Sequence, residues 1–254
     1  MKFAGFFLSV LALFVLATTG YVRADETLVL ALSFDEGQGD IAQDSSQYGF
    51  DGSIQGSQWV DGKFGKALEF DGVDDFVEVA DAPELRLLNG ATIMVWGFVR
   101  SGGHASWPRF IHKADTTGGT GGWEVLLDRA AGDAVRVCVG GACNSYIPLS
   151  SESWHHVAVT FDEAMVKVYV DGELVGENDQ PGPSVDTPDL SVFIGNSFNG
   201  ERQYQGIIDE VKVWSRALDQ DDIKVQMNMG VQETATSVDP RSKVTATWAE
   251  IKNQ

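Results

Sequence analysis

The sequence predicts an all-β fold, a sandwich of two antiparallel sheets with one short helix near the C-terminus. Three observations lead to this prediction. Apolar runs are short and alternate with period two, Gly, Asp and Asn interrupt them, and no long helical pattern separates them. About ten to fourteen strands at this spacing are typical of a β-sandwich or a barrel.

The first 24 residues are expected to be a secretory signal peptide rather than part of the fold. A basic Lys2 precedes the apolar run Phe3–Ala17, and the segment ends in the small-residue site Val22-Arg23-Ala24. The run is shorter than the roughly 20 residues of a spanning helix, although an uncleaved membrane anchor is the alternative. We therefore expect a sandwich over residues 25–230 and a tail over 231–254. The protein would be secreted or at the cell surface, with the periplasm also open and no membrane span after cleavage.

The expected strands follow one another along the rest of the chain. The first, Leu28–Phe34, alternates larger and smaller residues, and Ala91–Val99 is apolar on both faces, which is typical of a central strand. The other expected strands are KALEF, FVEV, WEVLLD, AVRVCV, HHVAVTF, VKVYV, SVFIG and IIDEVKVW. Asp71-Gly72 and Asp171-Gly172 are dipeptides that favour hairpin turns.

One helix is expected late in the chain. Asp219 can cap it with Asp222 three residues on, and Ile223 and Met227 share one face. Gly230 is the expected end. The polar residues after it are read as a poorly ordered tail or a short extension.

The two cysteines lie in the stretch RVCVGGACNSY. If Gly140-Gly141 is a two-residue hairpin turn, Cys138 faces Cys143 directly across the strands. We expect a disulfide between them, worth about 2 kcal/mol for so small a loop, with two reduced thiols as the alternative.

The charge of the chain limits its partners. The formal net charge is −19, and losing Lys2 and Arg23 without any acid would make the exported chain about −21. Such a surface repels nucleic acid and anionic lipid, and it suits calcium.

The order of the motifs resembles the LamG-like jelly-roll family of concanavalin A-like lectin/glucanase sandwiches. The motifs are LSFDEGQGDIAQDSSQYGFDG, GKFGKALEFDGVDDFVEV, ATIMVWGFV, WHHVAVTFD followed by MVKVYVDGELV, SVFIGN and GIIDEVKVWSRALDQDDI. They extend from Leu28 to Met229. The resemblance implies a concave sheet and extracellular binding, commonly of carbohydrate.

Asp209, a carboxylate that we expect to be buried, is the main candidate for a metal ligand. In GIIDEVKVW, alternation places Asp209 on one face with Ile207, Val211 and Val213, where an ionised group needs a partner or a cation. The resemblance implies a role for this residue, because in related glucanases the aspartate of a similar last strand binds a structural calcium ion together with groups from the first strand. Here that strand ends in Asp35 and Glu36, so a calcium site is expected. The alternative partners of Asp209 are backbone groups or Arg216.

The acid-rich stretch GKALEFDGVDDFVEV is interpreted mainly as turn chemistry, with a contribution to a metal site as the alternative. Asp-Gly favours a turn, since Gly accepts positive φ and Asp hydrogen-bonds its own backbone. Retaining glucanases of the superfamily carry three alternating acids on one strand, and the sequence has no such stretch. We therefore expect no enzymatic activity.

Aromatic residues in loops are the candidates for ligand binding. The expected ligand-binding residues are Trp107, Trp123, Tyr146, Asn196, Arg202 and Tyr204. For the tryptophans, the alternative is that they close the ends of the sandwich. We predict a non-catalytic module for an extracellular glycan. The alternatives are a surface protein as partner and, less favoured, a divergent glycoside hydrolase.

Overall fold

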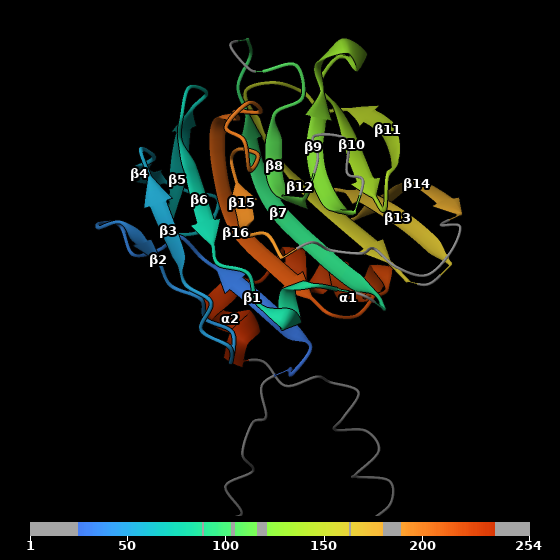
Figure 1. The fold of residues 1–254 in the computed structure, drawn as a ribbon, viewed down its shortest axis with the longest axis horizontal. Coiled ribbons are helices and arrows are strands. Elements are labelled where there is room, and N and C mark those ends of the chain that lie inside the picture. Colours follow the sequence, from blue (N-terminus) through green and yellow to red (C-terminus); the bar gives the residue numbers. More distant parts are fainter. Residues whose placement is uncertain are drawn as a thin grey trace, which may run out of the picture.

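The computed structural model describes residues 25–236 except 88, 103–104, 116–120, 163 and 180–188. Two antiparallel sheets pack face to face, which confirms the predicted sandwich (Figure 1). Sheet A has the order β14-β13-β12-β7-β16-β5-β4, with β1 beside part of β16, and sheet B has the order β11-β10-β9-β8-β15-β6-β3-β2. The expected signal peptide, 1–24, and residues 237–254 of the expected tail, 231–254, lie outside the described residues.

The strands of sheet A are β1 (Leu28–Leu32), β4 (Gln58–Asp61), β5 (Lys66–Asp71), β7 (Ala91–Val99), β12 (Ser153–Phe161), β13 (Met165–Val170), β14 (Glu173–Asp179) and β16 (Gln205–Trp214). Those of sheet B are β2 (Ile41–Ala42), β3 (Gly52–Gln55), β6 (Phe76–Val79), β8 (Arg109–Ala114), β9 (Gly122–Asp128), β10 (Ala134–Val139), β11 (Ala142–Pro148) and β15 (Val192–Ile194). Two 3₁₀ turns span Pro83–Leu85 and Arg129–Ala131. Strand β7 is central, as predicted, because it pairs with β12 on one side and β16 on the other.

Helices α1 (Gln220–Met227) and α2 (Val231–Thr236) cover the outer face of sheet A. Their buried Ile223 and Val231 form a second apolar cluster with Met94 and Trp214, apart from the main core between the sheets. The predicted helix is confirmed, although it ends before Gly230. Since Val231 is fully buried, the packed chain continues past residue 230. Neither helix has the length and apolar surface needed to cross a membrane.

A bulge in β16 changes the expected face of Asp209. The first half of β16 pairs with β5 and the second half with β1, and the register with β7 shifts between Asp209 and Lys212. The main core therefore receives Ile208 together with Val211 and Val213, not Ile207. The strict alternation assumed from the sequence was wrong, because the bulge inserts an extra residue.

The two predicted hairpin turns have different outcomes. Asp171-Gly172 joins the paired strands β13 and β14, and both residues have positive φ, as a tight hairpin requires. Asp71-Gly72 does not form a hairpin, because β5 belongs to sheet A and β6 to sheet B. The turn Asp71–Asp75 instead carries the chain from one sheet to the other.

The predicted disulfide is confirmed. Cys138 on β10 pairs in register with Cys143 on β11, and a bond joins their sulfur atoms. Gly140 and Gly141 both have positive φ, which is the conformation that the two-residue turn requires.

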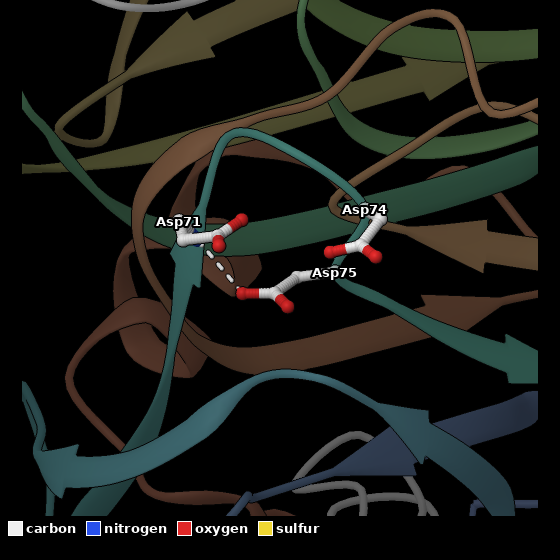
Figure 2. Close-up of side chains that lie close together, drawn as sticks. All are labelled: Asp71, Asp74 and Asp75. Atoms are coloured by element: carbon white, nitrogen blue, oxygen red, sulfur yellow. Dashed lines mark hydrogen bonds between the residues drawn. The ribbon is translucent and has the colours of Figure 1, made fainter.

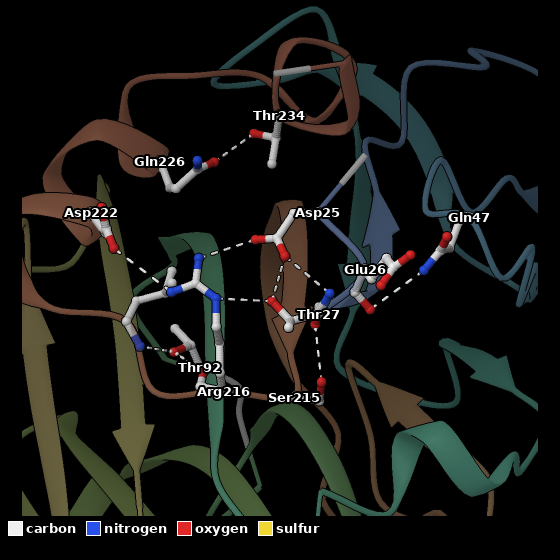
Figure 3. A network of polar contacts seen from close by, with 11 residues as sticks. Asp25, Glu26, Thr27, Gln47, Thr92, Ser215, Arg216, Asp222, Gln226 and Thr234 are labelled. Carbon is white, nitrogen blue, oxygen red and sulfur yellow. Dashed lines mark hydrogen bonds and ion pairs between the residues drawn. The ribbon is translucent and has the colours of Figure 1, made fainter. Parts of the chain in front are cut away.

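A polar network ties the start of the described chain to the end of β16 (Figure 3). Arg216 Nη2 donates to Asp25 Oδ2 at 3.1 Å, and its Nη1 lies 3.8 Å from Asp222 Oδ2. Its Nε donates to the Thr27 hydroxyl at 2.9 Å. Arg216 is therefore not the partner of Asp209 that one reading of the sequence allowed.

Candidate functional site

Three parts of the structure gather chemistry that a binding protein can use. We call the buried Asp209 and Glu210, together with the exposed Asp35, the carboxylate cluster. The segment Asp71–Asp75 is the acidic turn. The exposed side chains of Trp107 and Phe198 and the half-buried side chain of Arg202 form the loop surface.

Asp209 is fully buried, and only one of its two oxygens has hydrogen-bond partners. Oδ2 accepts from the backbone N–H groups of Lys63 (2.8 Å) and Phe64 (3.0 Å), whereas Oδ1 has none among the described residues. Burial raises the pKa of Asp209 to about 8, with the two N–H groups opposing this and the charges of Glu210 and Asp35 adding to it. The alternative in which backbone groups are the partners of Asp209 therefore accounts for only one of its two oxygens.

The turn between β4 and β5 brings Asp35 and Asp209 to the same place. A Cβ on Gly62 would lie 2.6 Å from Asp209 Oδ2, and one on Gly65 would lie 1.9 Å from Asp35 Oδ1. Asp35 Oδ1 accepts from the N–H of Lys66 at 2.8 Å. Glycine is required at both positions because the two carboxylates approach the backbone so closely.

The donor set fits a hard cation such as calcium, which prefers carboxylate and carbonyl oxygens. Asp209 supplies a buried oxygen without a partner, and Asp35 lies near enough for its charge to act on Asp209. Glu36 is directed toward another segment, since its Oε1 accepts from the N–H of Gln43 at 2.7 Å. Glu36 Oε2 is buried without a hydrogen-bond partner among the described residues, as is Asp209 Oδ1. Asp209 and Asp35 are the residues that would hold calcium here, and Glu36 could supply a further oxygen.

Glu210 follows Asp209 in the bulge, with a φ of 53°. It is buried, and Lys212 Nζ lies 3.4 Å from its Oε2. Burial raises the pKa of Glu210 to about 7, and the charge of Lys212 opposes the shift. The two adjacent acids, expected on opposite faces of a regular strand, are thus both buried.

The acidic turn holds three carboxylates whose oxygens lie within 4.8 Å of one another, so they could hold a metal ion (Figure 2). Their hydrogen bonds also serve the turn. Asp71 Oδ1 accepts from the N–H of Val73 at 2.7 Å, and Asp75 Oδ2 accepts from the N–H of Asp71 at 2.8 Å. This is the turn chemistry expected of Asp-Gly.

A cavity of about 260 Å³ opens beside the acidic turn. Its walls include Asp71, Asp75 and the ion pair between Arg100 and Glu69. Burial raises the pKa of Asp75, partly offset by the N–H of Asp71, and the charges of Asp71 and Asp74 add to the rise. The cavity has the size and polarity for one small polar ligand.

The loop surface exposes two large aromatic side chains. Trp107 is 39% exposed and Phe198 is 38% exposed. The guanidinium of Arg202 lies 5.1 Å from the centre of the Trp107 ring, and Phe198 stacks on His112 with ring centres 5.7 Å apart. These residues come from the segment before β8 and from the segment between β15 and β16.

A buried ionic network beneath the loop surface fixes both segments. Glu124 on β9 pairs with Arg109 through Oε2, which also lies 3.2 Å from His112 Nδ1. Arg109 donates from its backbone N–H to the carbonyl of Arg202 (3.1 Å) and from Nη1 to the carbonyl of Trp107 (2.5 Å). All three network residues are fully or almost fully buried, so the aromatic side chains rest on a rigid base.

The structure brings together some of the predicted ligand residues. Asn196 is buried beside the loop surface, where its Oδ1 accepts from the N–H groups of Ser197 (2.9 Å) and Arg202 (3.2 Å). It therefore shapes the segment rather than facing a ligand. Tyr146 is part-buried on β11, with its hydroxyl bonded to Asn178 on β14.

Trp123 and Tyr204 have no exposed surface, and both belong to the main core. The hydroxyl of Tyr204 donates to the carbonyl of Phe98 at 2.8 Å. Neither ring offers a face to a ligand, so both leave the set of ligand candidates. The reason is physical, since large aromatic side chains fill sandwich cores.

Sequence reasoning did not single out Phe198, Arg109, His112 or Glu124. The available signal was a charged residue inside an apolar strand, in RFIHKA and in WEVLLD. Such residues need partners when buried, but the pairing across β8 and β9 appears only in the structure.

A family model described as the concanavalin A-like lectin/glucanases superfamily matches residues 71–224. The chain belongs to this superfamily. The match covers more than half of the chain, and the resemblance seen in the order of motifs is thereby confirmed.

Solved structures of similar fold are mostly binding domains of larger proteins. The binding domain of Paraclostridial Mosquitocidal Protein 1 aligns with a TM-score of 0.62 at 17% identity, over 80% of this chain and 52% of that one. Domain 4 of a GH43 extracellular arabinanase from Geobacillus stearothermophilus, in complex with arabinotriose, aligns with a TM-score of 0.60 at 18% identity, over 79% and 98%. The receptor binding domain of botulinum neurotoxin mosaic serotype C/D aligns with a TM-score of 0.59 at 14% identity, over 79% and 50%.

The chain thus spans about half the length of the two toxin domains and nearly all of the arabinanase domain. Comparison with curated proteins gives no significant match.

Proposed function

We propose that the chain is an exported, non-catalytic module that binds carbohydrate through the loop surface, with a structural calcium ion at Asp35 and Asp209. The observation that carries the proposal is the exposure of Trp107 and Phe198 on a rigid ionic base. A binding site works best when its contact residues are held in place before the ligand arrives.

Exposed aromatic rings suit a sugar because the C–H face of a sugar ring stacks on them, while planar polar side chains take its hydroxyls. A solitary exposed Trp needs no explanation, but here a second aromatic ring and a guanidinium lie on the same pair of segments. The arabinanase domain of similar fold was solved with arabinotriose, which supports a saccharide as the ligand class.

The first test is binding of the purified exported chain to a panel of soluble and insoluble polysaccharides, with calcium and with EDTA, while released reducing ends are measured. We expect retention on at least one glycan without release. Trp107→Ala should weaken that binding by about tenfold, since it removes an aromatic contact worth about 1.5 kcal/mol.

Leu174→Ala is the matched control, because Leu174 is 44% exposed on β14 and lies outside the loop surface. It should bind as the unchanged chain does. Equal loss in both variants, or retention on no glycan, would contradict a glycan site at Trp107. Release of sugar would contradict a non-catalytic module.

A protein partner is the second candidate function. Trp and Arg are enriched at the energetic centres of protein interfaces, and two of the structures of similar fold are a toxin binding domain and a receptor binding domain. Loss of partner capture from a cell-surface extract by Trp107→Ala, in the absence of glycan binding, would favour this function.

A further inference from the structure

The lack of an ion-pair partner sets Arg202 apart from the other arginines that the structure describes. Each of the others has a carboxylate partner within ion-pair distance, namely Arg86, Arg100, Arg109, Arg129, Arg136 and Arg216. Arg202 has none among the described residues, and its Nε is buried without a hydrogen-bond partner. This is unexpected in a chain with 37 acidic and 18 basic residues.

The neighbouring acids are held away from the Arg202 guanidinium. Glu201 precedes it, but its Oε2 accepts from Asn199 Nδ2 at 3.0 Å. Glu124 is buried and is paired with Arg109 and His112. No carboxylate of the described part of the chain lies within ion-pair distance of Arg202.

The position of Arg202 is fixed by its backbone. Its N–H donates to Asn196 Oδ1 at 3.2 Å, and its carbonyl accepts from the N–H of Arg109 at 3.1 Å. Its guanidinium is stacked over the Trp107 ring. A guanidinium held in this way keeps its planar fork for a carboxylate, which can take two parallel hydrogen bonds from it.

A second positive charge lies nearby. The pKa of Arg109 is lowered to about 10 by burial, the charge of Glu124 opposes this, and the charge of Arg202 lowers it further. The guanidinium groups of Arg109 and Arg202 are thus close enough to repel each other, and only that of Arg109 pairs with the buried Glu124 among the described residues. Because Arg109 is buried and paired, Arg202 is the cation that the loop surface offers to a ligand. Remote acids are screened beyond about 8 Å at physiological ionic strength.

We propose that the loop surface recognises a carboxylated saccharide of the uronic acid type, whose carboxylate pairs with Arg202 while its ring lies against Trp107 or Phe198. This inference rests on the proposed carbohydrate-binding function and names the class of sugar. It also explains why an unpaired arginine is kept beside two exposed aromatic rings.

The test compares short soluble oligomers of galacturonate with their methyl esters, which share the sugar backbone and lack its charge. Titration calorimetry on the whole exported chain should give about tenfold or tighter binding of the acid form, as expected for hydrogen bonds between charged groups. Arg202→Gln should bind acid and ester alike. Arg202→Lys should keep part of the preference, because it restores the charge without the fork.

Arg136→Gln is the control, since it removes the same charge from sheet B but from a guanidinium that is already close to Asp128. It should keep the preference. Equal affinity of the unchanged chain for acid and ester would overturn the inference while the carbohydrate function stands. Binding of neither oligomer, together with retention of neutral glycans in the panel, would also overturn it. A preference for the acid form that Arg202→Gln retains would overturn the inference as well, because another residue would then bind the carboxylate.

Discussion

His156 is the residue whose charge the fold restricts most clearly. It is almost completely buried, and its ring lies 5.2 Å from that of Trp96. Burial lowers the pKa of His156 to about 3, the charge of Lys212 adds to this, and the charge of Asp171 opposes it. The folded chain therefore keeps His156 neutral where the unfolded chain would protonate it.

The predicted consequence is a loss of stability in acid. His156 contributes stability that is fully present above pH 6.5 and is lost as the pH falls through about 3. Over most of that window the effect is about 1.4 kcal/mol per pH unit. Urea unfolding between pH 4.5 and 7.5 measures this. As the pH falls, the free energy of unfolding of His156→Gln should decrease less steeply than that of the unchanged chain, by about this slope.

The neighbouring His155 provides a control of opposite sign. Its hydrogen bond with Asp171 raises its pKa, so its stabilisation is present below pH 6.5 and is lost as the pH rises through the folded value. His155→Gln should thus weaken the protein more at pH 5 than at pH 8. The prediction for His156 is wrong if both variants change the pH dependence of the free energy of unfolding in acid in the same direction.

At the residue scale, chemistry that depends on neighbours along the chain could be predicted, and chemistry that depends on packing could not. The Cys138–Cys143 pair follows from a two-residue turn, and the structure has it. Trp123 was expected beside a loop because a glycine-rich segment precedes it, and Tyr204 because it lies in the polar stretch NSFNGERQYQ, yet the sandwich closes over both. Whether an aromatic side chain faces solvent is decided by the opposite sheet.

At the scale of elements, helix α1 shows how a single cap supports a packed surface. Asp219 accepts from the N–H of Asp222 at 2.9 Å, and α1 places Ile223 against Met94 and Trp214. Asp219→Ala should lower the free energy of unfolding by about 1 kcal/mol, or roughly 2–4 °C in Tm for a chain of this size.

Thermal unfolding followed by circular dichroism measures this change. Asp221→Ala is the control, because Asp221 lies in the first turn without being the cap. It should alter Tm by less. A Tm unchanged in Asp219→Ala would show that α1 does not depend on the cap.

Elements were predictable where one local rule decides them. The cap residue and the residues of one helical face predicted α1, and the apolar run Ala91–Val99 predicted the central strand β7. The rule failed for β5 and β6, because Asp-Gly indicates a turn but does not say whether the next strand stays in the same sheet. It failed also for β16, where no residue type marks the bulge at Asp209.

At the scale of the whole molecule, the proposed calcium site joins three distant segments. Asp35 follows the first strand, Gly62 and Gly65 lie in the turn between β4 and β5, and Asp209 lies in the last strand. Without a cation, ionisation of Asp209 opposes folding. Burial raises the pKa of Asp209 to about 8. The stability that protonated Asp209 contributes is therefore fully present below pH 4 and is lost as the pH rises through about 8.

Calcium should reverse this effect, because it binds the ionised carboxylate. At a concentration about 100 times its Kd, calcium would add about 2.7 kcal/mol and raise Tm by roughly 5–10 °C. The rise should be larger at pH 8 than at pH 6, and EDTA should remove it. Asp209→Asn keeps an oxygen for the N–H groups of Lys63 and Phe64 but lacks the charge, so it should show little or no rise.

Asp74→Asn separates this site from the acidic turn. Asp74 is exposed and belongs to the three carboxylates that could also hold a metal ion. If calcium binds at Asp35 and Asp209, the variant should keep the full rise in Tm. A rise that disappears in Asp74→Asn and persists in Asp209→Asn would place the cation at the acidic turn. In that case the folded chain would neutralise the buried Asp209 by protonation, without a cation.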